Sequence, residues 1–265
     1  TIDGNINSHD TIAFCNGIIS SINSWDPFVH LLEHCDFKIL RHDFRGQYLS
    51  DKSNDEITFK KHAEDFIAIL DKELIDTVNL IGTSYGSIFC LYMAINYSER
   101  VSSLMLINPV AEVNGHFTWT VTEWLKLCKK RNIEELYNNI ASIIYSSSFF
   151  EKHYNQILQR REQMKRVQDD FWSGLEKLFI NTLENTFFMK ELHKISQPTL
   201  VIAGDEDRLT PVTFARNIYQ RINGAELIII EECGHASIIE KSNLLTSMII
   251  GFILNNQEIV NVEQY

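Results

Sequence analysis

Gly82-Thr83-Ser84-Tyr85-Gly86 lies between an apolar run at 77–81 and a second apolar run at 88–97. The spacing is G-x-S-x-G, and its flanks predict a strand before it and a helix after it. A turn this tight has no room for side chains two residues before and after the serine. The Ser84 hydroxyl is then expected at the carboxyl edge of a sheet, beside the first amides of the helix. This context predicts a nucleophile at Ser84, and the alternative is a glycine turn with a helix-capping serine.

On both sides of this segment, apolar runs of strand length alternate with stretches of helical period. The near-continuous apolar character of the runs is typical of parallel strands buried on both faces, so we predict an α/β fold with a doubly wound, mostly parallel sheet. The predicted strands are 11–15, 37–42, 77–81, 101–107, 199–203 and 225–230, and the predicted helices are 25–32, 58–74 and 88–97.

The segment 112–192 breaks this alternation. It has helical patterns rich in aromatic residues and no β-branched strand run. We predict that it is a helical cap over the strand ends, with an α/β core formed by 1–111 and 193–265. The alternative is a plain helical extension whose aromatic residues form a small core of their own.

A serine hydroxyl is a poor nucleophile without a base, which is usually a histidine. His235 follows the last predicted strand and lies after Gly234, whose small size leaves space for the imidazole. We predict His235 as the general base, with a capped loop histidine as the alternative. The other histidines considered are on predicted helix surfaces (His34, His62 and His193), in the 112–192 segment (His116 and His153) and at the end of the second strand (His42).

An acid is needed to hold the tautomer of the base and to stabilise its imidazolium form. The loop after the fifth predicted strand offers Asp205, Glu206 and Asp207. Asp207 lies deepest in this loop and is our prediction. Asp205 is the weaker alternative, because it and Glu206 are also suited to form a turn or to face solvent.

Two backbone donors should face the oxyanion of a tetrahedral intermediate. The Tyr85 amide is the first, because the turn at Ser84 fixes it. We expect the second, the Ile18 amide, in the loop Asn16-Gly17-Ile18 after the first strand. The alternative for this loop is an ordinary strand-to-helix turn.

Composition narrows the partners. The 265 residues include 24 Lys and Arg against 35 Asp and Glu, a net charge of −11, with no dense basic cluster. Nucleic acid is therefore not an expected partner. No motif for a metal or a dinucleotide is present, so we expect no cofactor.

The cysteines and the apolar runs bear on location. Five cysteines, an odd number without CxxC spacing, predict reduced thiols. The sequence contains no run of 18 apolar residues, so no membrane span is predicted. No basic-then-apolar leader is visible. We therefore expect a cytoplasmic protein; the oligomeric state stays open.

The chain resembles the α/β-hydrolase fold family from about residue 11 to 254. The similar blocks are 14–17 with Trp25 downstream, Asp43-Phe44-Arg45-Gly46, the turn at Ser84, 97–101, the loop from Gly204 through Asp207 to Pro211, and Gly234-His235. Asn16-Gly17 replaces the His-Gly of most relatives and is more similar to oxoadipate enol-lactonases and hydroxyacyl transferases of rhamnolipid biosynthesis. The resemblance implies a triad of Ser84, Asp207 and His235, with Ile18 and Tyr85 as oxyanion donors.

We therefore expect a serine hydrolase that cleaves a carboxylic ester, lactone or thioester of an apolar acyl group, free or carrier-bound. Transfer of the acyl group to an alcohol or to a second acyl chain uses the same triad, as does cofactor-free cleavage of a carbon–carbon bond. A non-catalytic ligand-binding protein on this scaffold is the alternative from another class. A serine at position 84 disfavours haloalkane dehalogenase chemistry, whose nucleophile is an aspartate.

Overall fold

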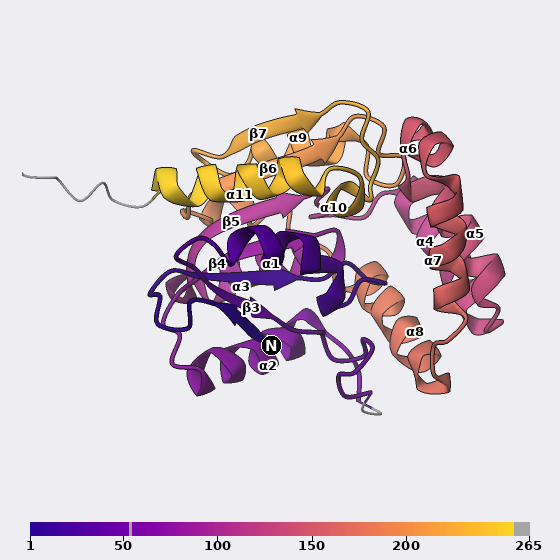
Figure 1. The fold of residues 1–265 in the computed structure, drawn as a ribbon, viewed down its shortest axis with the longest axis horizontal. Coiled ribbons are helices and arrows are strands. Elements are labelled where there is room, and N and C mark those ends of the chain that lie inside the picture. Colours follow the sequence, from indigo (N-terminus) through magenta and orange to yellow (C-terminus); the bar gives the residue numbers. More distant parts are fainter. Residues whose placement is uncertain (53–54, 257–265) are drawn as a thin grey trace, which may run out of the picture.

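A seven-stranded sheet with the order β1-β3-β2-β4-β5-β6-β7 forms the centre of the molecule (Figure 1). The computed structural model describes residues 1–52 and 55–256. All neighbouring strands are parallel except β1, which pairs antiparallel with β3. The strands are β1 (Ile2–Gly4), β2 (Thr11–Cys15), β3 (Lys38–Arg41), β4 (Val78–Thr83), β5 (Val101–Ile107), β6 (Thr199–Gly204) and β7 (Glu226–Ile230).

Helices cover both faces of the sheet because side chains that alternate along each strand point to opposite sides. Along β2, Ile12 and Phe14 pack with α1 and α11, while Ala13 and Cys15 pack with α2, α3 and α9. This two-sided burial explains the near-continuous apolar runs. The helices outside the insertion are α1 (Asp26–Leu32), α2 (Phe59–Lys72), α3 (Tyr85–Asn96), α9 (Val212–Tyr219), α10 (Ser237–Glu240) and α11 (Ser242–Asn256), with short 3-10 turns at Ile22–Trp25, Ser98–Arg100 and Leu192–Lys194.

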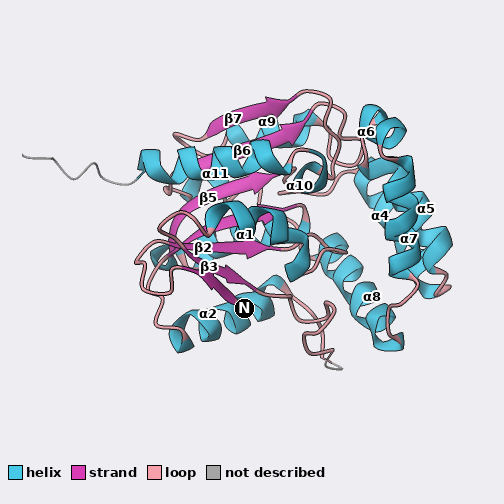
Figure 2. Cartoon of the chain, in the orientation of Figure 1, coloured by secondary structure: helices cyan, strands magenta, loops and turns pink. Residues whose placement is uncertain are grey.

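A helical insertion, α4–α8, connects β5 to β6 and lies at the end of the molecule toward which the parallel strands point (Figure 2). Asparagine side chains cap two of its helices: Asn114 accepts from the Phe117 amide and Asn132 from the Glu135 amide. Its bounds are α4 (Gly115–Lys129), α5 (Ile133–Ile144), α6 (Ser147–Lys152), α7 (Tyr154–Met164) and α8 (Asp169–Glu184).

The predicted fold class is confirmed: the sheet is mostly parallel, doubly wound and interrupted by helices. Each predicted strand is present within two residues of its expected ends. The structure adds β1, which the sequence pattern did not predict. It is three residues long and pairs only with β3, so it carries no apolar run of its own.

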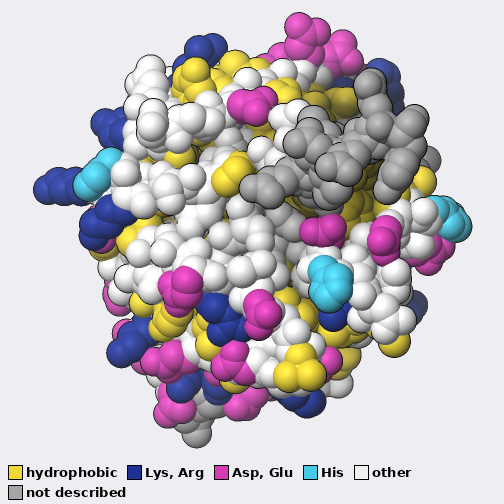
Figure 3. Space-filling model, turned by 90° about the vertical axis from the view of Figure 1, so that its left-hand side faces the viewer, with side chains coloured by type: hydrophobic (Ala, Val, Ile, Leu, Met, Phe, Trp, Pro, Cys, Tyr) yellow, Lys and Arg dark blue, Asp and Glu magenta, His cyan; other side chains and the backbone are white. Residues whose placement is uncertain are grey.

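Acidic and basic side chains intermingle on the face opposite the insertion (Figure 3). Among the described residues on that side, no extended basic surface is visible, in line with the net charge of −11. Within the described residues, no helix has the length and apolar character needed to cross a membrane.

Candidate active site

Ser84 occupies a strained turn between β4 and α3. Its φ of 52° and ψ of −115° lie outside the regions that non-glycine residues usually adopt. Such strain persists only where the surrounding structure enforces it. The turn leaves the Ser84 side chain half-buried at the carboxyl edge of the sheet.

The two glycines that flank Ser84 are required by close backbone contacts. A Cβ at Gly82 would lie 2.4 Å from the Gly86 oxygen, and a Cβ at Gly86 would lie 2.0 Å from the Cys15 oxygen. Neither contact is tolerable, and neither involves a flexible side chain. The G-x-S-x-G spacing is thus explained by the packing of α3 against β2 and β4.

Three side chains far apart in sequence meet at this edge. The His235 Nε2 lies 2.9 Å from the Ser84 Oγ, and the His235 Nδ1 lies 2.7 Å from the Asp207 Oδ2. His235 and Asp207 are both buried, at 8% and 4% exposed. Because Asp207 accepts at Nδ1, the neutral imidazole carries its proton there and presents the lone pair of Nε2 to Ser84.

The carboxylate of Asp207 is held by its own loop as well as by His235. Its Oδ1 accepts from the amides of Leu209 and Thr210, and its Oδ2 accepts from the Thr210 hydroxyl at 2.7 Å. That hydroxyl also lies 3.2 Å from the His235 Nδ1. Thr210 therefore touches both members of the pair, a contact that no sequence motif predicted.

The other two carboxylates of this loop point elsewhere. Asp205 is exposed and accepts from the Cys233 amide, while the Glu206 Oε2 accepts from the Ser147 amide of the insertion at 2.8 Å. Both fix loop geometry at a distance from the imidazole.

Gly234 is required by close contacts with the insertion. A Cβ there would lie 2.5 Å from the Ile144 oxygen and from the Ser146 nitrogen. The prediction concerned space for the imidazole, and the structure adds this second reason for a glycine. The insertion backbone thus packs directly against the loop that carries His235.

Asn108, at the end of β5, ties this loop to the sheet. Its Nδ2 donates to the His235 oxygen at 2.7 Å and to the Ser237 Oγ, and its Oδ1 accepts from the Gly204 amide. Asn108 is fully buried and has φ 47°. From the sequence, Asn108 is only the residue that follows a predicted strand.

The predicted oxyanion residues lie beside Ser84. Ile18 and Tyr85 line one small cavity together with the serine. Tyr85 is the first residue of α3, where backbone amides have no partner inside the helix. The structure thus brings together all five residues singled out in the sequence.

The cavities at Ser84 are small and apolar. One, of about 20 Å³, extends under α4 and α8 past Trp124 and Phe179; the other, of about 110 Å³, opens between α5 and α10 past Ile140 and Ile238. Among the described residues that line them, none is Lys, Arg, Asp or Glu.

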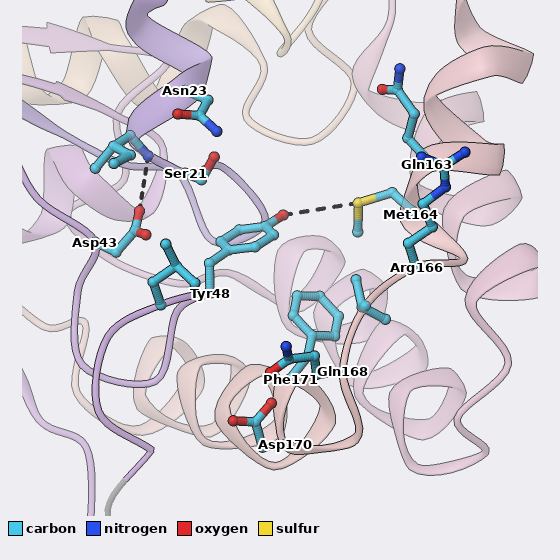
Figure 4. A pocket seen from close by; sticks show the side chains of 13 residues that line it. Ser21, Asn23, Asp43, Tyr48, Gln163, Met164, Arg166, Gln168, Asp170 and Phe171 are labelled. Carbon is cyan, nitrogen blue, oxygen red and sulfur yellow. Dashed lines mark hydrogen bonds between the residues drawn. The ribbon is translucent and has the colours of Figure 1, made fainter.

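A wider cavity of about 510 Å³ lies on the other side of the loop at 17–22 (Figure 4). Residues of α7 and α8 line it together with Ser21, Asn23 and Tyr48, and the Tyr48 hydroxyl points to the Met164 sulfur. Its lining includes neither Ser84 nor His235.

His62 corrects a prediction. We expected it on a helix surface, but it is 1% exposed and its Nε2 lies 2.8 Å from the Tyr85 hydroxyl. Asn181 of α8 donates to the same hydroxyl at 2.6 Å. Burial lowers the pKa of His62 to about 3 and raises that of Tyr85, so both groups are neutral. The Tyr85 side chain thereby joins the turn at Ser84 to the insertion.

Comparisons with known proteins identify similar sequences and folds. A 2-hydroxy-6-oxononadienedioate/2-hydroxy-6-oxononatrienedioate hydrolase of Klebsiella pneumoniae subsp. pneumoniae is 25% identical over 257 residues, which cover 92% of this chain and 87% of the relative. The structure of MGS-M2, an alpha/beta hydrolase enzyme from a Medee basin deep-sea metagenome library, has a TM-score of 0.90 and 30% identity, covering 96% of this chain and 92% of that one.

A third similarity concerns the fold alone. The enol-lactonase from Burkholderia xenovorans LB400 superposes with a TM-score of 0.84 at 21% identity, covering 96% of this chain and 95% of its own. The family model described as alpha/beta hydrolase fold matches residues 10–242. Together with the strained serine turn and the doubly wound sheet, this match shows that the chain belongs to the alpha/beta hydrolase fold family.

Proposed function

We propose that the chain is a serine hydrolase that forms an acyl-enzyme on Ser84. The observation that carries this proposal is the unbroken contact from Ser84 through His235 to Asp207, at 2.9 and 2.7 Å. The His235 Nε2 takes the hydroxyl proton while the Ser84 Oγ attacks the substrate carbonyl. Asp207 stabilises the resulting imidazolium without itself taking the proton.

In the following steps His235 acts first as an acid and then again as a base. The imidazolium gives its proton to the leaving alcohol, thiol or enol as the carbonyl–leaving group bond breaks. A water molecule then loses a proton to His235 and attacks the acyl carbon. The imidazolium returns that proton to the Ser84 Oγ as the bond between the acyl carbon and Oγ breaks, which releases the acid and restores Ser84. In both steps the amides of Ile18 and Tyr85 are the proposed donors to the oxyanion, each contributing about 3–4 kcal/mol by comparison with known oxyanion holes.

The lining of the Ser84 cavities supports an uncharged, apolar acyl group. Isoleucine, leucine and aromatic side chains surround the reacting position, and a carboxylate placed there would lose its hydration without gaining a cation. We therefore propose a carboxylic ester, lactone or thioester as substrate, with residues 112–192 acting as a cap on a core of 1–111 and 193–265.

A second candidate is hydrolysis of a carbon–carbon bond. The relative from Klebsiella is named for a hydroxy-oxo-dioate, a compound without an ester, so its hydrolysis must break a bond between carbons. Such a dianion needs cationic partners, and the described lining at Ser84 has none. This contrast ranks the ester proposal first.

The test combines turnover with covalent trapping. The wild-type protein should hydrolyse nitrophenyl esters of short apolar acids, and a fluorophosphonate should add its mass to Ser84. Ser84→Ala should remove both, lowering turnover by about 10⁶-fold, as in other serine hydrolases. Ser102→Ala makes the same change at an exposed position of β5 and is the control for the general effect of the substitution.

Two results would contradict the proposal. Ser84→Ala protein with wild-type ester turnover would exclude the acyl-enzyme. Turnover of a hydroxy-oxo-dioate well above that of every ester would favour the second candidate. Repeating the assay with an added alcohol then separates hydrolysis from acyl transfer, because transfer yields a new ester in place of the acid.

A further inference from the structure

We propose that Gln47 is a positioning residue that aims the Ile18 amide at the oxyanion; the inference rests on the serine hydrolase function proposed above. Gln47 follows β3 in the loop that resembles the family's Asp-x-Arg-Gly block, and it is 2% exposed. Its Nε2 donates to the Gly17 oxygen at 2.8 Å and more weakly to the Ile18 oxygen at 3.3 Å.

The planar peptide bond turns this contact into control of the Ile18 amide. In a trans peptide the C=O of one residue and the N–H of the next point in opposite directions. The bond from Gln47 to the Gly17 oxygen therefore directs the Ile18 N–H away from Gln47. Ile18 lines both cavities at Ser84, and the proposal therefore places its N–H at the position that the oxyanion would occupy.

The orientation of the Gln47 amide is itself determined by its partners. The Phe44 amide donates to the Gln47 Oε1 at 3.0 Å, which identifies that atom as the oxygen and leaves the NH₂ group facing Gly17. Asn16 donates to the same oxygen at 3.1 Å. Asn16 is fixed in turn, because its Oδ1 accepts from the Trp25 indole at 2.8 Å.

A buried relay therefore runs from Trp25 through Asn16 and Gln47 to the peptide between Gly17 and Ile18. Each polar atom in it has a partner, which a buried amide requires to offset its desolvation. The Ser20 amide also donates to the Gly17 oxygen, at 3.1 Å, but it belongs to the same turn and moves with it. Gln47 is the side chain that anchors this peptide from outside the turn.

Ser50 offers a comparison in the same loop, three residues further on. Its hydroxyl donates to the Asp43 backbone oxygen at 2.6 Å. Removing that hydroxyl breaks a hydrogen bond of the loop that carries Gln47 without removing any contact to the Gly17–Ile18 peptide.

The experiment uses two variants at Gln47 and one at Ser50. Gln47→Glu retains the acceptor for Phe44 and Asn16 and loses the donor to Gly17, while Gln47→Met loses both. For each variant we measure ester kcat and KM, and the affinity for a trifluoromethyl ketone of the same acyl group. That ketone forms an oxyanion on Ser84 and so depends on the amides of Ile18 and Tyr85.

We expect kcat to fall about 10- to 100-fold in both Gln47 variants, because a misdirected oxyanion donor costs part of what its deletion costs. KM should stay within about threefold, and the ketone affinity should fall by the same factor as kcat/KM. Ser50→Ala should leave kcat and the ketone affinity within about twofold of wild type.

Folded Gln47→Glu protein with wild-type kcat and ketone affinity would overturn the inference. A rise in KM by the same factor as the fall in ketone affinity would also overturn it. If neither variant folds, ¹⁵N-labelled wild-type protein decides: the Gln47 side-chain amide should exchange slowly, and rapid exchange would overturn the inference. Failure of the proposed function is distinguishable, because it requires Ser84→Ala to remain active.

Discussion

At the scale of single residues, the carboxylate of Asp207 determines which nitrogen of His235 holds the proton. Asp207→Asn should lower kcat by about 10⁴-fold with little change in KM, because an amide NH₂ facing Nδ1 favours the tautomer that cannot accept from Ser84. Steady-state kinetics on the ester identified above measures the effect. Circular dichroism of the same sample checks that the variant is folded.

Asp205→Asn is the matched control, with the same change two residues earlier in the loop. Asp205 is exposed, and an asparagine oxygen can still accept from the Cys233 amide. Its kcat should remain near that of wild type. A comparable loss in both variants would mean that loop charge, and not the tautomer of His235, controls turnover.

The residues of the candidate site differ in how well they could be predicted from the sequence. Ser84, Asp207 and His235 each follow a strand in an order that the fold predicts, so local pattern and chain order name them. Gln47 and Asn108 act through contacts with residues 30 and 127 positions away in sequence, at Gly17 and His235. No local pattern carries that information, because a glutamine in a loop has many possible partners until the fold selects one.

At the scale of elements, the core-facing side of α2 contains a histidine that we predicted on the surface of the helix. A helix was predicted over 58–74, and Phe59, Ala63, Phe66 and Leu70 of α2 are buried in the core. His62 lies three residues after Phe59 and therefore on the same face, but its polarity suggested solvent. The Tyr85 hydroxyl stabilises it there, although its Nδ1 has no partner among the described residues.

This buried imidazole predicts acid sensitivity. The pKa of His62 is about 3 in the folded protein, lowered mainly by burial, against about 6.5 in the unfolded chain. Between these values the unfolded chain binds a proton that the folded protein does not. The free energy of unfolding is therefore unaffected by His62 above about pH 6.5 and falls by about 1.4 kcal/mol per pH unit below it.

Urea denaturation of wild type and His62→Gln at pH 7, 6, 5 and 4.5 tests this. Glutamine can keep a hydrogen bond to Tyr85 but cannot take up a proton, so the variant should lose less stability than wild type as the pH falls. His193→Gln, at an exposed position on a short turn, is the control and should follow wild type. Parallel curves for wild type and His62→Gln would show that His62 is not the group responsible.

At the scale of the whole molecule, the insertion meets the core where loops of the candidate site lie. Gly174 of α8 packs on Gly46, directly before Gln47: a Cβ on Gly174 would lie 2.0 Å from the Gly46 oxygen. The second contact is that of Gly234 with the insertion backbone. A glycine inside a helix is destabilising relative to alanine, and no local pattern predicts a contact at Gly174. The crossing of α8 over a distant loop explains why a glycine is present there.

We therefore expect substitution by alanine to have opposite effects on the free energy of unfolding at two helix glycines. Gly251, in α11, has open space at its Cβ position, so Gly251→Ala should raise the free energy of unfolding by about 0.5–1 kcal/mol through helix propensity alone. Gly174→Ala should lower it by about 1–3 kcal/mol, because α8 must move away from Gly46. That movement should also displace Gln47, so the ester kcat should fall in Gly174→Ala and not in Gly251→Ala. Urea denaturation and ester kinetics on both variants measure the two effects, and a stabilised, fully active Gly174→Ala protein would show that the insertion does not hold this loop in place.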